Sequence, residues 1–237
     1  MLFVLCSVAY LPVSTSAQSI DQALQIIEQA VQDGSIPGAS ILIMQHGQVV
    51  EQRSFGVCEI EQGRPFQEDT ICWIASLTKP ITAAAAMKLV EDGKLQLDSP
   101  IEDYLPEMSQ LATQDSRKHS VTIRHLMSHS SGISASVPLR PRFFFSQEWY
   151  ARTLPEVVEA IAKRPLDFVP GSKVHYSNAA PYVLGRIIEV SSGQKFDEFV
   201  SNEILKPLQM NDTGFAIPTD SLSRTATVYR REGQELS

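Results

Sequence analysis

The sequence predicts an α+β fold, an α/β sandwich that carries a mostly helical part. One observation is that a helical repeat of apolar residues near the N-terminus is followed by two β-rich runs. A second is that the pattern turns helical after Ser76, and no long β-rich run comes later to extend the sheet. We therefore expect one domain over residues 18–237, with residues 18–75 as its α/β part and residues 76–215 as its helical part.

The first elements follow from the spacing of the apolar residues. Between residues 20 and 31 these recur with a helical period, which predicts an amphipathic helix. Residues 39–44 and 49–55 are rich in β-formers and are separated by a short turn that contains Gly47, so they predict a β-hairpin. A third short strand is expected at residues 70–74.

The later elements are predicted to be helices. Residues 81–91 contain four consecutive alanines and are followed by Gly93, a pattern typical of a helix and its stop. Loops rich in Pro, Ser and Gly separate further helical segments, expected at residues 123–128, 154–162, 180–190 and 196–204. Residues 140–149 form an aromatic and basic loop, whose Phe143 to Phe145 only hint at a substrate contact.

The N-terminus has the pattern of a secretory signal. Residues 2–13 are almost entirely apolar and residues 14–17 are small, which predicts cleavage after Ala17 and a secreted or periplasmic protein. The apolar stretch is too short to span a bilayer as a helix, so no stable membrane insertion is expected. No Lys or Arg precedes it, which leaves open a start site further upstream or another role for the segment.

Composition excludes several classes of function. Hydrophobic residues make up 43% and charged residues 20% of the 237 positions, as in ordinary globular proteins. The net charge of −7 and the absence of a Lys/Arg run argue against nucleic acid as a partner, so a small-molecule or peptide substrate is expected. Once a signal is removed, Cys58 and Cys72 remain, and we expect two separate half-buried thiols, although an oxidising compartment would permit them to pair. The sequence does not define an oligomeric state.

No cofactor or metal is predicted. His125 and His129 stand four residues apart, a spacing that suits two zinc ligands on one helix face. No Glu follows His125 and no third ligand is evident, so hydrogen bonding between a helix and a loop is the better interpretation.

Two segments match Ser-x-x-Lys, a pattern that occurs about once by chance in a chain of this length. Ser192 and Lys195 follow a helical run and flank Gly193, so this match is interpreted as a helix end. Ser76 and Lys79 instead follow an expected strand and open a helix, where the next residue, a proline, is tolerated in the first turn.

The Ser76 segment suits a nucleophile. Residues three apart share a helix face, so the Lys79 amine is expected within reach of the Ser76 hydroxyl. The positive end of the helix dipole favours an alkoxide and disfavours a second cation, which favours the basic form of Lys79. The alternative is a helix-capping serine beside a surface lysine.

Tyr176 and Asn178 are the candidate partners of this pair. A phenol becomes a usable base when a nearby cation stabilises the phenolate, and Lys79 is such a cation. The Asn178 amide is expected to point at a substrate carbonyl or at Lys79. The alternative is a loop tyrosine followed by an asparagine that caps a helix.

With these motifs, the chain resembles the serine β-lactamase and penicillin-binding protein superfamily, and specifically the class C β-lactamase-like hydrolases. Ser76-Leu77-Thr78-Lys79 and Tyr176-Ser177-Asn178 are similar to the first two motifs of that family. The similarity runs in order over about residues 20 to 220 and includes residues 95–101, 104–106, 122–133, 170–171 and 208–215.

The resemblance implies a β-lactamase/transpeptidase-like fold and an acyl-enzyme on Ser76, formed from an amide or an ester. Lys79 and Tyr176 would share the proton transfers, Asn178 would bind substrate, and the Ser76 N–H would be one oxyanion donor. The substrate stays open among a β-lactam, a D-amino-acid peptide and a small ester. A non-catalytic penicillin-recognising or regulatory module that retains the fold is the alternative function.

One expected motif of the family is missing. The family carries a third motif, Lys/His-x-Gly, on a late strand that lines the substrate, and no such triplet follows Tyr176. We therefore expect a C-terminally truncated reading frame or a fragment that lacks the last strands of the antiparallel sheet and has an impaired site.

Overall fold

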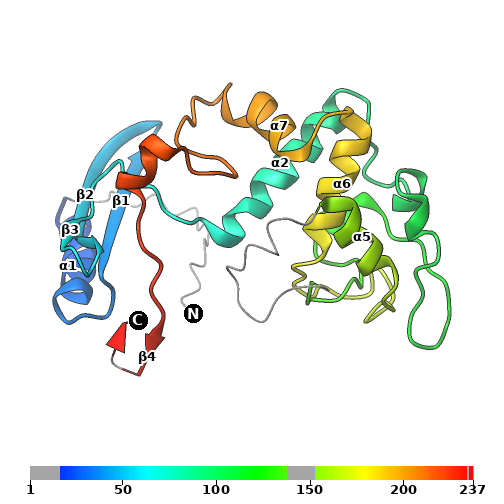
Figure 1. Ribbon diagram of the computed structural model, residues 1–237, viewed down its shortest axis with the longest axis horizontal. Helices are drawn as coiled ribbons and strands as arrows, with labels where there is room; N and C mark the ends of the chain where they lie inside the picture. Colours follow the sequence, from blue (N-terminus) through cyan, green and yellow to red (C-terminus); the bar gives the residue numbers. More distant parts are fainter. Residues whose placement is uncertain (1–16, 138–152, 234, 237) are drawn as a thin grey trace. The chain divides into compact units, whose positions relative to one another are not determined.

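The computed structural model describes residues 17–137, 153–233 and 235–236. The expected signal segment, apart from Ala17, and the aromatic loop at residues 140–149 lie outside these residues. The described residues divide into two compact units, one formed by residues up to 73 together with those from 217 onward, and the other by residues 74–216 (Figure 1).

The first unit holds a helix and a small antiparallel sheet. Its main elements are α1 (Ala17–Gln32), β1 (Gly38–Gln45), β2 (Gln48–Glu59) and β3 (Arg64–Pro65), with the strands in the order β1-β2-β3. The predicted hairpin is confirmed, because His46 and Gly47 both adopt the positive φ that a tight turn between two strands requires. Helix α1 packs on β1 and β2 and buries Leu24.

The strand expected at residues 70–74 was wrong. Ile71 makes an isolated parallel bridge to Thr225, closed by hydrogen bonds from Ile71 N to Arg224 O and from Ala226 N to Ile71 O, both 2.9 Å. The residues directly before Thr225 form a 3₁₀ helix, Thr219–Arg224, so they supply no extended backbone with which residues 70–74 could pair. The third strand is β3 instead.

The C-terminal strands do not extend this sheet. Within the residues described, β4 (Arg231–Glu232) and β5 (Glu235–Leu236) pair only with each other. The described part of the sheet therefore has three strands, as expected for a sheet without its late strands.

The second unit is helical, and α6 lies at its centre. Helix α6 contacts four other helices, and Figure 1 shows it beside α2 and α5. The α-helices of this unit are α2 (Thr78–Glu91), α3 (Ile123–Met127), α5 (Leu154–Ala162), α6 (Ala180–Ser192) and α7 (Phe196–Val200). A π-helical turn, Ser201–Leu205, continues α7, and short 3₁₀ helices lie at Ala75–Leu77, Ile101–Asp103 and Pro106–Met108.

These helices confirm the expected ones, with shifts of a few residues at their ends. Ala85 and Ala86 of α2 are fully buried, and such small side chains allow close packing between α2 and α6. Gly193, with φ of 71°, ends α6 directly after Ser192, which confirms that the second Ser-x-x-Lys match is a helix end. No helix in the described part of the chain is long and apolar enough to cross a membrane.

The core of the second unit predicts a large cost for truncating Leu89. Its side chain is fully buried among α2, α6 and their neighbours, so Leu89→Ala should lower the free energy of unfolding by about 2–5 kcal/mol. Leu208→Ala is the matched control, because Leu208 is 65% exposed and its loss should cost at most about 0.5 kcal/mol. Urea unfolding followed by circular dichroism measures both, and equal costs would contradict the assigned core.

Candidate active site

Ser76 stands at the beginning of the helix that carries Lys79. Ala75 has a φ of 46°, and the chain then passes through the 3₁₀ turn into α2. Such a conformation is uncommon for a residue with a side chain, and it lets the backbone turn sharply just before Ser76. The Ser76 side chain is exposed, and Lys79, half-buried one turn later, donates a 3.0 Å hydrogen bond from Nζ to Ser76 Oγ.

Tyr176 and Asn178 reach the same two side chains from a distant part of the sequence. The Tyr176 hydroxyl donates a 2.7 Å hydrogen bond to Ser76 Oγ, and Lys79 Nζ donates a 3.1 Å bond to Asn178 Oδ1. Lys79 Nζ also lies 4.7 Å from the centroid of the Tyr176 ring. The structure therefore brings all four residues predicted from the sequence into one cluster.

Ser177, between these two residues, fixes the backbone that presents them. Its buried hydroxyl donates to Ser134 O at 2.9 Å and accepts the N–H groups of Ala179 at 3.1 Å and Ala180 at 3.0 Å. Ser177 thereby satisfies the first donors of α6, a task that the alternative interpretation gave to Asn178. That alternative was wrong, since the Asn178 side chain bonds to Lys79.

The loop that follows α3 accepts hydrogen bonds from the segment of residues 176–178. Asn178 N donates to Ala135 O at 3.1 Å, close to the Ser134 carbonyl that holds Ser177. Gly132 has a φ of 77°, and a Cβ there would lie 2.2 Å from Phe168 O, so only glycine fits. This explains why the loop requires a glycine at that position.

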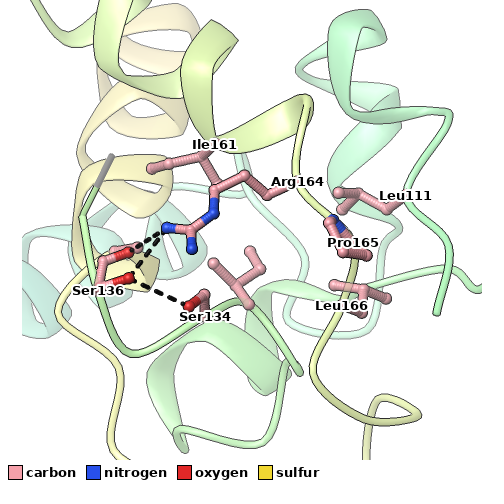
Figure 2. A pocket seen from close by; sticks show the side chains of 9 residues that line it. Leu111, Ser134, Ser136, Ile161, Arg164, Pro165 and Leu166 are labelled. Atoms are coloured by element: carbon pink, nitrogen blue, oxygen red, sulfur yellow. Dashed lines mark hydrogen bonds between the residues drawn. The ribbon is translucent and has the colours of Figure 1, made fainter. Parts of the chain in front are cut away.

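Arg164 ties the same loop to the end of α5. Its Nη1 donates to Ser136 O at 3.2 Å and to Ser136 Oγ at 3.0 Å, and Figure 2 shows the guanidinium pointing toward Ser136. A small hollow beside it is lined mainly by apolar side chains, among them Leu111 and Leu166. None of the four clustered residues lines this hollow, so it is separate from the site.

The two histidines make the hydrogen bonds expected between a helix and a loop. His125 Nδ1 accepts the Thr122 N–H at 3.2 Å at the start of α3, and His129 Nδ1 accepts the Ser177 N–H at 3.2 Å. Across the residues that the structure describes, no three His, Cys, Asp or Glu side chains are grouped as a metal would require. The contact of His129 with the site was not predicted, because nothing in the sequence pairs position 129 with position 177.

The charge of Lys79 sets the electrostatics of the cluster. Burial raises the pKa of the Tyr176 phenol, but interactions with Lys79 and Ser76, and the positive charge of Lys79, outweigh burial and hold that pKa below its ordinary value. Burial and the same charge lower the pKa of His129. The phenolate of Tyr176 and the neutral form of His129 are therefore favoured together.

The two cysteines of the described residues belong to the first unit. Both are free thiols, as expected, but neither is half-buried, because Cys58 is buried and Cys72 is exposed. Partial burial raises the pKa of the Cys72 thiol, so it is less reactive than an ordinary surface cysteine.

The comparison with known families covers nearly the whole chain. The family model described as beta-lactamase matches residues 23–237. The chain belongs to the beta-lactamase family. This confirms the resemblance inferred from the motifs and the β-lactamase/transpeptidase-like, α+β fold.

Proteins similar to this chain include an esterase, a hydrolase with acyltransferase activity and a penicillin-binding protein homologue. Esterase EstB of Burkholderia gladioli is 36% identical over 197 residues, which cover 80% of this chain and 50% of the esterase. The structure of EstCE1, a hydrolase with promiscuous acyltransferase activity, has a TM-score of 0.81 at 29% identity and covers 93% of this chain and 59% of its own. The octameric penicillin-binding protein homologue from Pyrococcus abyssi has a TM-score of 0.76 at 31% identity, and the match covers 92% of this chain and 50% of the homologue.

The chain spans about half the length of the curated relatives that it matches, from 42% to 55%. The four clustered residues all lie within the unit of residues 74–216. The candidate site can thus be described within one compact unit.

Because the Lys79 charge holds down the pKa of the Tyr176 phenol, we expect Lys79→Met to raise that pKa. Burial raises the pKa of the phenol, and without the lysine charge less remains to lower it. The pKa is measured from the ultraviolet absorbance of the phenolate, with the matching Tyr176→Phe protein subtracted in each background. Lys195→Met, in the other Ser-x-x-Lys segment, is the control and should change nothing, and an unchanged pKa in Lys79→Met would contradict the assignment.

Proposed function

We propose that the protein is a serine hydrolase that forms an acyl-enzyme on Ser76, with small esters as its substrate class. The observation that carries the proposal is that Ser76 Oγ lies 3.0 Å from Lys79 Nζ and 2.7 Å from the Tyr176 hydroxyl. A nucleophilic hydroxyl needs a base within hydrogen-bond reach, and here it has a base and a cation together. Membership of the beta-lactamase family supports the same chemistry.

Acylation begins with proton transfer from Ser76. The Tyr176 phenolate, whose formation Lys79 favours, takes the hydroxyl proton while Ser76 Oγ bonds to the carbonyl carbon of the ester. The carbonyl π electrons move to oxygen and give a tetrahedral oxyanion. When this collapses, the bond to the leaving alkoxide breaks, and Tyr176 returns the proton to the departing alcohol.

Deacylation repeats these steps with water. Tyr176 takes a proton from the water that attacks the Ser76 ester and then returns it to Ser76 Oγ as the carboxylic acid leaves. The Ser76 N–H, in the first helical turn, is the oxyanion donor that this chain supplies beside the nucleophile. Asn178 holds the Lys79 ammonium in place and is the group beside it that can contact substrate.

Two of the similar proteins support an ester as the substrate class. EstB is named an esterase, and EstCE1 is described as a hydrolase with acyltransferase activity. Ser76 is exposed and Tyr176 is 48% exposed, so the described residues leave the nucleophile accessible to a small acyl group. A β-lactam or a D-amino-acid peptide is the competing substrate in the test below.

We also propose, from the apolar segment at residues 2–13, that the protein is secreted or periplasmic.

Hydrolysis of p-nitrophenyl esters tests the proposal. Ser76→Ala should abolish turnover, and Lys79→Met and Tyr176→Phe should each lower kcat/KM by about 10²–10⁴-fold, the usual contribution of a proton carrier. Nitrocefin and a D-alanyl-D-alanine peptide are assayed in parallel to rank the substrate classes.

Ser192→Ala is the matched control, because Ser192 has the same Ser-x-x-Lys spacing but ends a helix. Its activity should equal that of the wild type. A folded wild-type protein that acylates with none of these compounds would contradict the proposal and would support a non-catalytic module of the same fold.

A further inference from the structure

His129 contacts three consecutive residues centred on Tyr176. Its backbone oxygen accepts the His175 N–H at 2.8 Å, and its Nδ1 accepts the Ser177 N–H at 3.2 Å. Its ring packs on the Tyr176 ring with centroids 4.7 Å apart and planes inclined by 32°. One residue therefore holds the backbone on both sides of the phenol and the phenol ring itself.

The backbone of His129 is unusual in a way that serves these contacts. Its φ is 56°, in the left-handed region that few residues with a side chain adopt. This conformation directly follows α3 and Ser128, and it points the carbonyl and the imidazole at the same segment. Such a conformation persists where the surrounding contacts hold it, and these contacts include the candidate base.

We propose that His129 is a positioning residue that holds the Tyr176 phenol against Ser76, and that it does so only as the neutral imidazole. The proposal rests on the proposed function, since it concerns the base of that reaction. His129 is not proposed to touch Ser76 or the reacting carbonyl. It acts by holding Tyr176 in place.

The requirement for a neutral ring follows from the hydrogen bond to Ser177. The backbone N–H of Ser177 is a donor, so Nδ1 of His129 must offer its lone pair and the ring proton must lie on Nε2. A second proton would go to Nδ1 and point at the Ser177 N–H, which removes the bond. The resulting cation would also lie near the Lys79 ammonium.

The groups around His129 reinforce this dependence on its charge. Lys79 from α2 is the cation that acts on it, Tyr176 is the titratable ring in contact, and His175 meets it through the backbone, with its own ring against Phe168. Lys79 and His129 line one small hollow, and its other lining residues carry no titratable group: Thr82, Ala83, Leu126, Met127, Pro181 and Leu184. Burial and the Lys79 charge lower the pKa of His129, so the neutral form persists below the ordinary histidine value of about 6.5.

Two substitutions separate this role from general stabilisation. His129→Asn keeps an acceptor near the Nδ1 position and a residue that tolerates positive φ, but it does not titrate. His129→Leu keeps bulk and removes the acceptor. His125→Asn is the control, because His125 Nδ1 also accepts a backbone N–H, that of Thr122, without contact to Tyr176.

The first readout is the rate at which a fluorophosphonate ester labels the 237-residue chain, measured across pH. His129→Leu should slow labelling at neutral pH by about 10²-fold, the cost of a misplaced catalytic group, and His129→Asn should restore most of the rate. The acid limb of the wild-type profile should include the protonation of His129, so His129→Asn should lose labelling less steeply as pH falls. His125→Asn should keep the wild-type profile.

The second readout is the pKa of the Tyr176 phenol, which needs no activity. In folded His129→Leu it should rise toward the ordinary value, because the phenol leaves Ser76 and Lys79. A wild-type rate and an unchanged pKa in folded His129→Leu would overturn the proposal. If His129→Leu does not fold, an unchanged acid limb in His129→Asn overturns it. If the wild type is not labelled at all, the proposed function fails, and the pKa comparison still decides the positioning role.

Discussion

The Lys79 ammonium is the constraint on which the candidate site depends. It is held by Ser76 Oγ at 3.0 Å on its own helix and by Asn178 Oδ1 at 3.1 Å from a segment about a hundred residues later. Its charge favours the phenolate of Tyr176 and the neutral ring of His129 at the same time. A single cation thus joins α2 to the start of α6 and lowers the pKa of both the Tyr176 phenol and the His129 imidazole.

Local sequence patterns predicted the helices and the hairpin because those patterns act within a few residues. The alanine run of α2 and the apolar spacing of α6 are of this kind, and so is the turn at Gly47. The strand expected at residues 70–74 was wrong because a strand needs a partner, and Ile71 finds only one bridged residue, Thr225. Strand pairing of this kind is set by distant residues that a local pattern does not contain.

The site was predicted only in part, for a related reason. Ser76 and Lys79 share one helical turn, and Tyr176 and Asn178 share a polar segment, so chemistry identified each pair and family resemblance joined them. The supporting residues gave no such signal. In the sequence Ser177 is an ordinary polar residue, and only the structure shows that its hydroxyl accepts the first N–H of α6. His129 is one of two spaced histidines in the sequence, and only the structure shows that its ring packs on Tyr176.

In the proposed function, Ser76 is the single activated hydroxyl in the described part of the chain. The most direct measurement is tandem mass spectrometry of the chain after brief exposure to a fluorophosphonate, with every modified serine mapped. We expect one adduct, on Ser76, and none on Ser192, although both serines belong to a Ser-x-x-Lys segment. A folded chain that carries no adduct on Ser76, or carries equal adducts on several exposed serines, would contradict it.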